Sequence, residues 1–174
     1  MSFVIKKFRN IEPDIKEALY IGDNCVLIGN IKLGKNVNIW PNSTIRADWA
    51  SIVVGENTNI QDNVVIHVDD SVNGDVVIGK NTTIGHGCII NSCKIGDNCL
   101  IGMGSIIGNG TIIEDGAFIG KGSNITPNSI VKTGEMWFGN PARFMRNLRS
   151  DDLQYMENDV KKYLELAKEF SEEE

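Results

Sequence analysis

The sequence predicts an all-β fold, a solenoid of about six triangular coils capped by one C-terminal α-helix. Three observations support this fold class. An aliphatic residue recurs every six positions, two other residue types keep the same register, and an apolar stripe with helical spacing lies near the end of the chain. The chain has 174 residues, of which 41% are hydrophobic, so one compact unit can bury a core.

The six-residue period runs through most of the chain. A period of six is neither the 3.6 of a helix nor the alternation of a single strand, so each hexad is expected to be one short strand and a corner. Three hexads then close one triangular coil, with the aliphatic side chain pointing inward. The aliphatic position is filled by Ile21, Leu27, Leu33, Ile39, Ile45, Val54, Ile60, Ile66, Ile78, Ile84, Ile90, Ile95, Ile101, Ile107, Ile113, Ile119, Ile125 and Val131.

Two further positions of the hexad keep this register. Glycine often follows the aliphatic residue, as at Gly55 and Gly102, and we expect it to supply the backbone freedom of a tight corner. A small or β-branched residue stands four places after the aliphatic one, as at Ser43 and Cys88, where it can fill the corner. The pattern therefore predicts the direction of side chains as well as the strands.

The C-terminal segment has a different pattern. Ser150 is a candidate N-cap, Asp151 and Asp152 suit a first helical turn, and an apolar stripe follows, so we predict a helix over about 151–170. The expected division is an N-terminal cap over 1–20, the β-helix over 21–136, a linker over 137–150, and the helix with an acidic tail over 151–174.

Charge and composition exclude several classes of protein. The net charge of −6 arises within residues 151–174, which hold 9 acidic and 3 basic residues, so the rest of the chain is neutral and offers no basic surface for nucleic acid. No apolar run approaches the length of about 20 residues that a membrane helix needs. Without an export signal near the N-terminus, we expect a cytoplasmic protein.

The four cysteines, Cys25, Cys88, Cys93 and Cys99, lack the paired spacing of a structural zinc site. Thiols stay reduced in the cytosol, so we do not expect disulfides. They are expected to be small core residues.

The period is interrupted three times, and interruptions in a solenoid are where site-building loops emerge. The step after Ile45 is nine residues, the step after Ile66 is twelve, and the step after Ile90 is five. Counting each as one hexad places Arg46, His67 and Asn91 in one column on successive coils. His86 follows a different aliphatic position and projects from another corner.

The twelve-residue step contains the acidic insertion Asp69–Asp75. We interpret it as a solvated β-bulge, and a proton-handling loop is the alternative.

The hexad pattern resembles the hexapeptide-repeat superfamily, which implies a left-handed parallel β-helix. Within it, the chain is similar to the γ-class carbonic anhydrases over nearly its whole length. The segments that carry this resemblance are Thr44-Ile45-Arg46-Ala47-Asp48, Asn59-Ile60-Gln61-Asp62-Asn63, His67-Val68-Asp69, Ile84-Gly85-His86-Gly87 and Gly139-Asn140-Pro141-Ala142-Arg143.

The resemblance implies a homotrimer that acts on CO2 and bicarbonate, with a divalent metal between subunits. The metal implied is zinc, with iron, cobalt or calcium as other candidates. His67 would come from one subunit and His86 from its neighbour, and the family's third histidine falls at Asn91. An amide oxygen is a weaker donor for zinc than imidazole and suits calcium or magnesium better.

The resemblance also implies roles for four other residues. Gln61 would orient the nucleophile, and Asn59 belongs to the same motif and is included in the catalytic set. Arg46 and Asp48 would form a pair that bridges subunits.

Other functions remain open at this point. The chain could be a hexapeptide-repeat acyltransferase that uses an acyl-CoA donor and a histidine base, or a non-catalytic trimeric scaffold. The two histidines could also be polar residues on the outer surface of the prism with no site.

Overall fold

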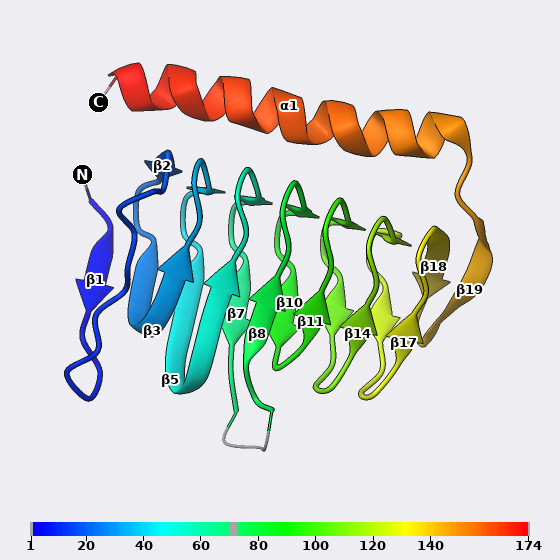
Figure 1. Ribbon diagram of the computed structural model, residues 1–174, viewed down its shortest axis with the longest axis horizontal. Helices are drawn as coiled ribbons and strands as arrows, with labels where there is room; N and C mark the ends of the chain where they lie inside the picture. Colours follow the sequence, from blue (N-terminus) through cyan, green and yellow to red (C-terminus); the bar gives the residue numbers. More distant parts are fainter. Residues whose placement is uncertain (1, 70–72, 174) are drawn as a thin grey trace.

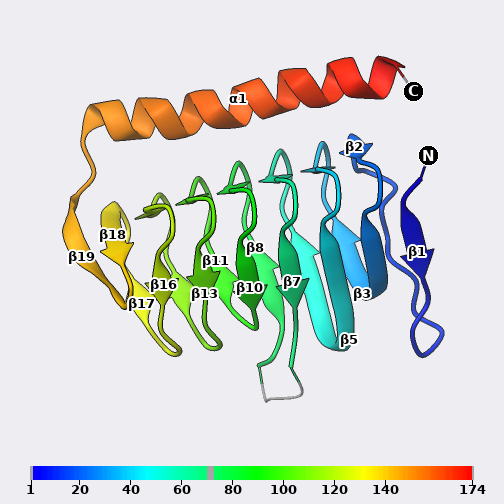
Figure 2. The same cartoon turned by 180° about the vertical axis from the view of Figure 1, so that it is seen from behind.

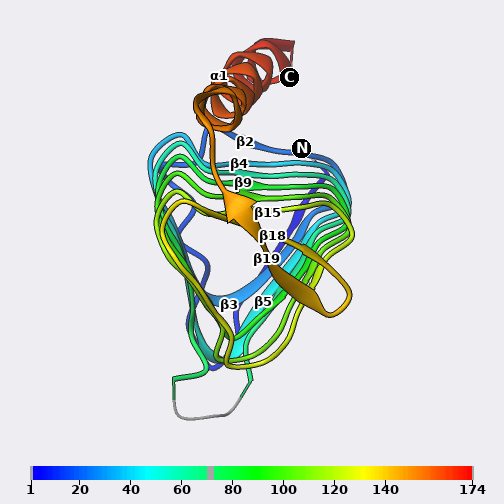
Figure 3. The same cartoon turned by 90° about the vertical axis from the view of Figure 1, so that its right-hand side faces the viewer.

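The chain winds into a triangular solenoid, and one helix runs along its side (Figure 1). The computed structural model describes residues 2–69 and 73–173. Viewed along the solenoid, the coils are stacked as a triangle, with the helix outside one of its sides (Figure 3). The predicted left-handed parallel β-helix is confirmed.

The solenoid has three faces, named here for what lies on them. The helix face consists of β2 (Tyr20–Ile21), β4 (Asn38–Ile39), β6 (Asn59–Ile60), β9 (Thr83–Ile84), β12 (Leu100–Ile101), β15 (Phe118–Ile119) and β18 (Glu135–Gly139). The histidine face consists of the first halves of β3 (Val26–Leu33) and β5 (Thr44–Val54), then β7 (Val65–His67), β10 (Ile89–Asn91), β13 (Ile106–Ile107) and β16 (Asn124–Ile125). The third face consists of the second halves of β3 and β5, then β8 (Val76–Ile78), β11 (Lys94–Ile95), β14 (Ile112–Ile113) and β17 (Ile130–Val131).

The solenoid has about seven turns, one more than the expected six. The additional turn comes from β18, in which Trp137 pairs with Ile119 and packs against the core. Trp137 lies six residues after Val131, so the period continues with an aromatic residue in the inward position. A count that includes only aliphatic residues therefore ends one coil too early.

The aliphatic residues of the hexads form the core. All eighteen are buried, each with at most 8% of its surface exposed, as the period predicts. Most of the small residues four places later are buried too, as Ser43 and Cys88 show. Burying one such aliphatic side chain stabilises the fold by about 1.5–3 kcal/mol, so this column supplies most of the driving force.

The glycine that often follows the aliphatic residue has a different role from the expected one. Gly55 and Gly102 do not have positive φ, but a Cβ at Gly55 would lie 2.6 Å from the backbone carbon of Gly79 on the next coil, and one at Gly102 would lie 2.5 Å from the Lys121 nitrogen. These glycines allow the coils to approach closely. The left-handed backbone of the corner falls two residues later, on asparagine or glycine, as at Asn98 (φ 54°) and Gly116 (φ 66°).

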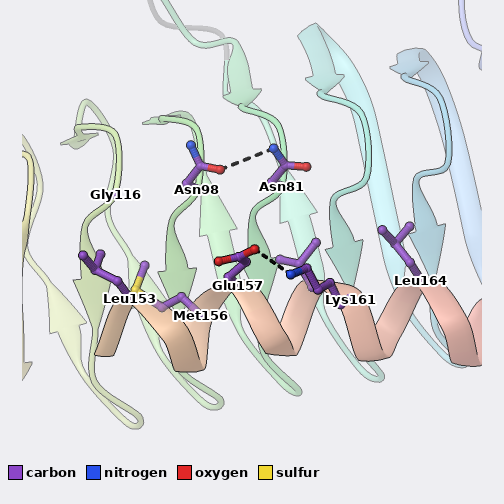
Figure 4. Close-up of a pocket in the computed structure, with 9 residues that line it drawn as sticks. Asn81, Asn98, Gly116, Leu153, Met156, Glu157, Lys161 and Leu164 are labelled. Atoms are coloured by element: carbon purple, nitrogen blue, oxygen red, sulfur yellow. Dashed lines mark hydrogen bonds and ion pairs between the residues drawn. The ribbon is translucent and has the colours of Figure 1, made fainter. Parts of the chain in front are cut away.

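The corner asparagines also bond to one another from coil to coil. Nδ2 of Asn36 donates to Oδ1 of Asn57, Asn57 donates likewise to Asn81, and Asn81 to Asn98, over 3.0, 3.0 and 3.3 Å. Figure 4 shows the last of these bonds, with Gly116 next in line. We call this row the asparagine ladder.

Helix α1 (Ser150–Glu173) lies along the helix face rather than over an end of the solenoid (Figure 1). Its Tyr163 and Phe170 rings pack on Trp40, with ring centroids 5.3 and 5.4 Å apart, and Ala167 is fully buried beside Tyr20. The predicted bounds of about 151–170 are close to the observed ones. The apolar stripe therefore covers a side of the prism.

Other segments cover the two ends. β1 (Val4–Lys6) pairs in parallel with β3, and Phe3, Ile5 and Ile15 of the N-terminal segment pack against the core. At the other end, the segment expected as a linker contains β19 (Ala142–Asn147), which forms an antiparallel hairpin with β18. Ala142 is buried against the last coil.

All four cysteines are free and buried, in agreement with their expected place in the core. Burial raises the pKa of the Cys88 thiol to about 11 and those of Cys93 and Cys99 to about 12, so these thiols are unreactive near neutral pH. In the described part of the chain, α1 is not apolar enough to cross a bilayer.

Candidate functional site

The predicted column of polar residues is present at one end of the histidine-face strands. His67 is the Cα partner of Arg46 on the preceding coil and of Asn91 on the following one. These strands, β5, β7 and β10, lie side by side in Figure 2. The count of residues across the interrupted hexads therefore gave the correct register.

Asp48 connects two members of this column. Its carboxylate accepts a hydrogen bond from Nε2 of His67 over 3.0 Å and forms an ion pair with Arg46. Burial acts to raise the pKa of Asp48, but a backbone amide, the bond to His67 and the charge of Arg46 outweigh it, so the pKa is lowered. The three side chains form one hydrogen-bonded cluster within a single chain.

Asn91 is held on one side only. Its Nδ2 donates to Oδ1 of Asn109 over 2.5 Å, and Asn109 in turn donates to Asp69. The Oδ1 of Asn91 is buried and has no hydrogen-bond partner within residues 2–69 and 73–173. A buried acceptor without a partner costs about 1–3 kcal/mol, and such a cost in a native fold calls for an explanation.

His86 lies at the opposite end of the same face, in the corner before β10. Its Nδ1 lies 2.8 Å from Asp62, its Nε2 lies 3.3 Å from the hydroxyl of Tyr163, and its backbone N–H donates to Oε1 of Gln61 over 3.1 Å. Burial first, and then the charges of Asp159 and Asp62, raise the pKa of Tyr163 to about 12, so this hydroxyl stays protonated at neutral pH. Helix α1 thus contacts a predicted site residue.

Gln61 and Asn59 are adjacent on the helix face. Nε2 of Gln61 donates to Oδ1 of Asn59 over 3.1 Å, and both side chains are buried. Their amides are fixed by hydrogen bonds and shielded from solvent.

Residues expected at one site thus fall into two groups on one chain. Arg46, Asp48, His67 and Asn91 lie at one end of the histidine face, and Asn59, Gln61 and His86 lie around the opposite corner. Within the described residues, no group of three or more His, Cys, Asp or Glu side chains could hold a metal ion. One chain alone therefore does not assemble the predicted ligand set.

Several residues near the predicted ones had no sequence signal. Asn109 and Tyr163 contact Asn91 and His86, but their spacing in the sequence does not indicate this. Asp62 stands within a segment that carries the family resemblance, so it could have been included as the partner of His86. Asn109 and Tyr163 reach their partners only through tertiary packing.

Part of the acidic insertion is described. Asp75 accepts hydrogen bonds from the Ser51 hydroxyl and backbone amide, both over 2.7 Å, and these bonds lower its pKa. Residues 70–72 lie outside the described residues, so the interpretations of the loop as a bulge or a proton-handling segment stay predictions.

Two hollows lie beside the solenoid, and the second of them adjoins the acidic insertion. One of about 500 Å³ lies between α1 and the asparagine ladder and is lined by Leu153, Met156 and Val160 with the Glu157–Lys161 ion pair (Figure 4). The other, of about 540 Å³, is lined by Asp75, Ser92 and Asn109 among others. Neither is lined by His67, His86 or Gln61.

This chain is similar to known proteins described as hexapeptide transferases and to others described as γ-carbonic anhydrases. The model of the bacterial transferase hexapeptide family (six repeats) matches residues 13–47 and 92–127. Mitochondrial γ-carbonic anhydrase 2 of Arabidopsis thaliana is 34% identical over 159 residues, which cover 89% of this chain and 57% of that protein. This chain thus spans less than two thirds of the plant relative.

Two other relatives match over nearly their whole length. Protein YrdA of Escherichia coli is 36% identical over 171 residues, which cover 94% of this chain and 93% of that protein. The crystal structure of a hexapeptide transferase family protein from Anaplasma phagocytophilum is 39% identical, with a TM-score of 0.90, and the match covers 96% of this chain and 98% of that one. The chain therefore belongs to the hexapeptide-repeat family of left-handed β-helix proteins, among relatives that include γ-carbonic anhydrases.

Proposed function

We propose that this protein is a homotrimeric, γ-carbonic anhydrase-like metalloprotein that interconverts CO2 and bicarbonate at a divalent metal held between subunits. The observation that carries the proposal is the buried Oδ1 of Asn91, which has no partner within the described residues and lies one coil from His67. A bound cation would satisfy this oxygen once the Asn91 amide turned outward, because Oδ1 is covered by its own chain in the described conformation. The reaction is inferred from the relatives that are named γ-carbonic anhydrases.

The positions of the two residue groups favour a ring of subunits. If His86 of one subunit meets His67 and Asn91 of the next, each contact joins two different edges. Such head-to-tail contacts form a closed ring when the rotation between subunits closes, as a three-fold rotation does in a trimer. Between these edges the histidine face carries an exposed apolar row, Val65, Ile89 and Ile106, which are Cα partners on successive coils. An exposed apolar row is typical of a subunit interface.

The side chains fit a metal at this interface. The His86 imidazole is oriented by Asp62 and the His67 imidazole by Asp48, and carboxylates commonly orient metal-binding histidines in this way. The amide oxygen of Asn91 is a hard donor, better suited to calcium or magnesium than to zinc. We expect zinc with reduced affinity, with iron, cobalt and calcium as the other candidates.

The chain's own residues would orient the reactants. A divalent metal supplies Lewis-acid activation of water at such a site. Gln61 uses Oε1 for the His86 amide and one Nε2 hydrogen for Asn59, so its second Nε2 hydrogen can orient the attacking water. Asp48, itself paired with Arg46, holds the His67 ring, and this charge pair would extend across the interface.

Metal content and CO2 hydration test this proposal together. Protein purified without added metal should form a trimer with about one divalent ion per chain, as measured by elemental analysis. Stopped-flow assays with zinc or iron supplied should detect CO2 hydration, and His86→Gln should abolish it while the trimer persists. A trimer that stays metal-free and inactive after reconstitution would rule the proposal out.

An acyltransferase is the second candidate, because both the matching family model and the Anaplasma relative are described as transferases. A histidine such as His86 would then act as general base towards an acyl acceptor, with acyl-CoA as donor. Calorimetric titration with acetyl-CoA tests this candidate, and the absence of heat would count against it.

A non-catalytic trimeric scaffold is the third candidate, favoured by an asparagine where the family has its third histidine. The Asn91→His variant tests this candidate, because activity in that variant alone would identify the parent as a scaffold.

A further inference from the structure

A chain of hydrogen bonds runs from His86 to helix α1. The His86 backbone N–H donates to Oε1 of Gln61 over 3.1 Å, and Nε2 of Gln61 donates to Oδ1 of Asn59 over 3.1 Å. Nδ2 of Asn59 then donates to Oγ1 of Thr83 over 2.9 Å, and the Thr83 hydroxyl donates to Oδ2 of Asp159 over 3.1 Å. Asp159 therefore connects α1 to two of the predicted catalytic residues.

The middle of this chain of hydrogen bonds is shielded from water. Asn59 is 0% exposed, Thr83 is 3% exposed and Gln61 is 5% exposed. A buried amide that loses its partner cannot turn to solvent for another, so each link depends on the next. The polar groups of the helix face thus act as one network.

The two ends of the network determine its direction. A backbone N–H can only donate, and an ionised carboxylate can only accept, whereas the amides and the hydroxyl between them can point either way. Starting from His86, only one arrangement gives every donor an acceptor, and that arrangement ends on an acceptor at Asp159. Reversing Gln61 would place its NH2 against the His86 N–H.

This direction matters for what Gln61 can offer a reacting group. In the observed arrangement Oε1 is engaged by His86 and one hydrogen of Nε2 by Asn59. The second Nε2 hydrogen has no partner within residues 2–69 and 73–173. Gln61 therefore offers a donor.

We propose that Asp159 of α1 is a positioning residue for this site, which acts through Thr83 to hold the amides of Asn59 and Gln61 in one orientation. Helix α1 is then part of the site as well as a cover for the solenoid. The kinetic consequence rests on the proposed function, but the orientation of the amides does not. The two can be tested separately.

Four variants of the full-length chain form the test. Asp159→Asn replaces the acceptor-only carboxylate with an amide that can also donate, and Thr83→Val removes the hydroxyl while keeping the shape of the side chain. Thr83→Ser keeps the hydroxyl and should rescue the network. Glu157→Gln is the matched control, because Glu157 lies on the same helix and pairs with Lys161 rather than with the helix face (Figure 4).

The first measurement is the side-chain amide NMR spectrum of Gln61 and Asn59 in 15N-labelled protein. We expect Asp159→Asn and Thr83→Val to shift both pairs of amide resonances and to increase their solvent exchange at least about tenfold. Thr83→Val removes a buried hydrogen bond, and Asp159→Asn replaces a charge-assisted acceptor with a weaker neutral one. Thr83→Ser and Glu157→Gln should leave them in place. Unchanged resonances in the first two variants, or equal shifts in Glu157→Gln, would overturn the inference.

The second measurement is kcat/KM for CO2 hydration. We expect a fall of about tenfold in Asp159→Asn and Thr83→Val, with Thr83→Ser and Glu157→Gln near the parent. If the parent is inactive while the resonances shift as expected, the proposed function fails and the positioning role of Asp159 stands. If the parent is active and both variants keep full kcat/KM, the positioning role fails.

Discussion

Asn91 lies directly above His67 in the stack of coils, as its Cα partner, and presents a buried Oδ1 that no other described group satisfies. The two side chains have different hydrogen-bond partners: His67 bonds to Asp48, and Asn91 bonds to Asn109. This pair is where the chain departs from the three-histidine pattern of the family it resembles. It is also where substitution is most informative.

Asn91→His should strengthen metal binding. Imidazole nitrogen is a better zinc donor than an amide oxygen, so we expect zinc affinity to rise at least about tenfold and CO2 hydration to rise with it. Competition with a chelator and stopped-flow assays measure the two effects. Asn91→Gln keeps an amide and is the matched control. If the parent is already as active as Asn91→His, the asparagine is not a deficiency, whereas activity in the variant alone would identify the parent as a scaffold.

Mixing two inactive variants should restore activity if the site lies between subunits. Equal amounts of His67→Ala and His86→Ala chains, unfolded and reassembled together, form trimers in which some interfaces hold both native histidines. Random mixing should restore about one quarter of the parent activity. Each variant reassembled alone is the control, and no recovery in the mixture would show that the two histidines do not cooperate across an interface.

Ile89→Asp should dissociate the trimer without unfolding the chain. Ile89 is 45% exposed in the middle of the apolar row on the histidine face, so a charge there is costly only when another subunit covers it. Ile112→Asp is the matched control, because Ile112 is 41% exposed on the third face. Analytical ultracentrifugation measures the oligomeric state. Dissociation by Ile112→Asp alone would move the interface to the third face.

Asp152 should make the stability of α1 depend on pH in acid. Its carboxylate accepts two hydrogen bonds from Arg146, over 2.6 and 3.0 Å, and one from the Arg149 amide. The Arg146 bonds first, and then the amide, lower the pKa of Asp152 from 3.8 to about 2. Because the folded pKa is the lower one, this stabilisation is present above the unfolded value near 3.8 and is lost as the pH falls towards 2.

The test compares Asp152→Asn with the parent in urea unfolding at several pH values and one protein concentration. The variant should be less stable at pH 6, and the difference should shrink between about pH 4 and pH 2. Asp151→Asn, in the same helical turn, is the control. A difference that stays constant down to pH 2 would contradict the assignment.

Glycines at the close approach between coils and glycines at the left-handed corners should respond differently to substitution. A Cβ at Gly102 would meet the Lys121 backbone, so Gly102→Ala should lower the free energy of unfolding by about 1–3 kcal/mol. A Cβ at Gly116 meets nothing within 4 Å, and asparagine takes the equivalent left-handed corner at Asn98. Gly116→Asn should therefore extend the asparagine ladder and stabilise the fold by about 0.5 kcal/mol. Thermal unfolding of both variants measures this, and the reverse order would contradict the assigned roles.

The sequence by itself determined the solenoid, its inward residues and the column of Arg46, His67 and Asn91. Each coil contacts only its neighbours at a fixed separation along the chain, so the packing leaves a period that can be counted. The count ended one coil early, because Trp137 fills an inward position with an aromatic ring. The hexad pattern also assigned the tight corner to the glycine after the aliphatic residue. The left-handed corner is instead formed two residues later, by asparagine or glycine.

Only the tertiary structure decided what lies beside the solenoid and which polar groups find partners. The apolar stripe of α1 predicts a helix but not the surface that it covers, and packing along the helix face brings Asp159 to Thr83, 76 residues away in the sequence. The unpartnered oxygen of Asn91 has no sequence signal, because satisfaction of a buried acceptor depends on every neighbour in space. Local periodicity encodes the coils, whereas contacts between distant segments depend on how the whole chain packs.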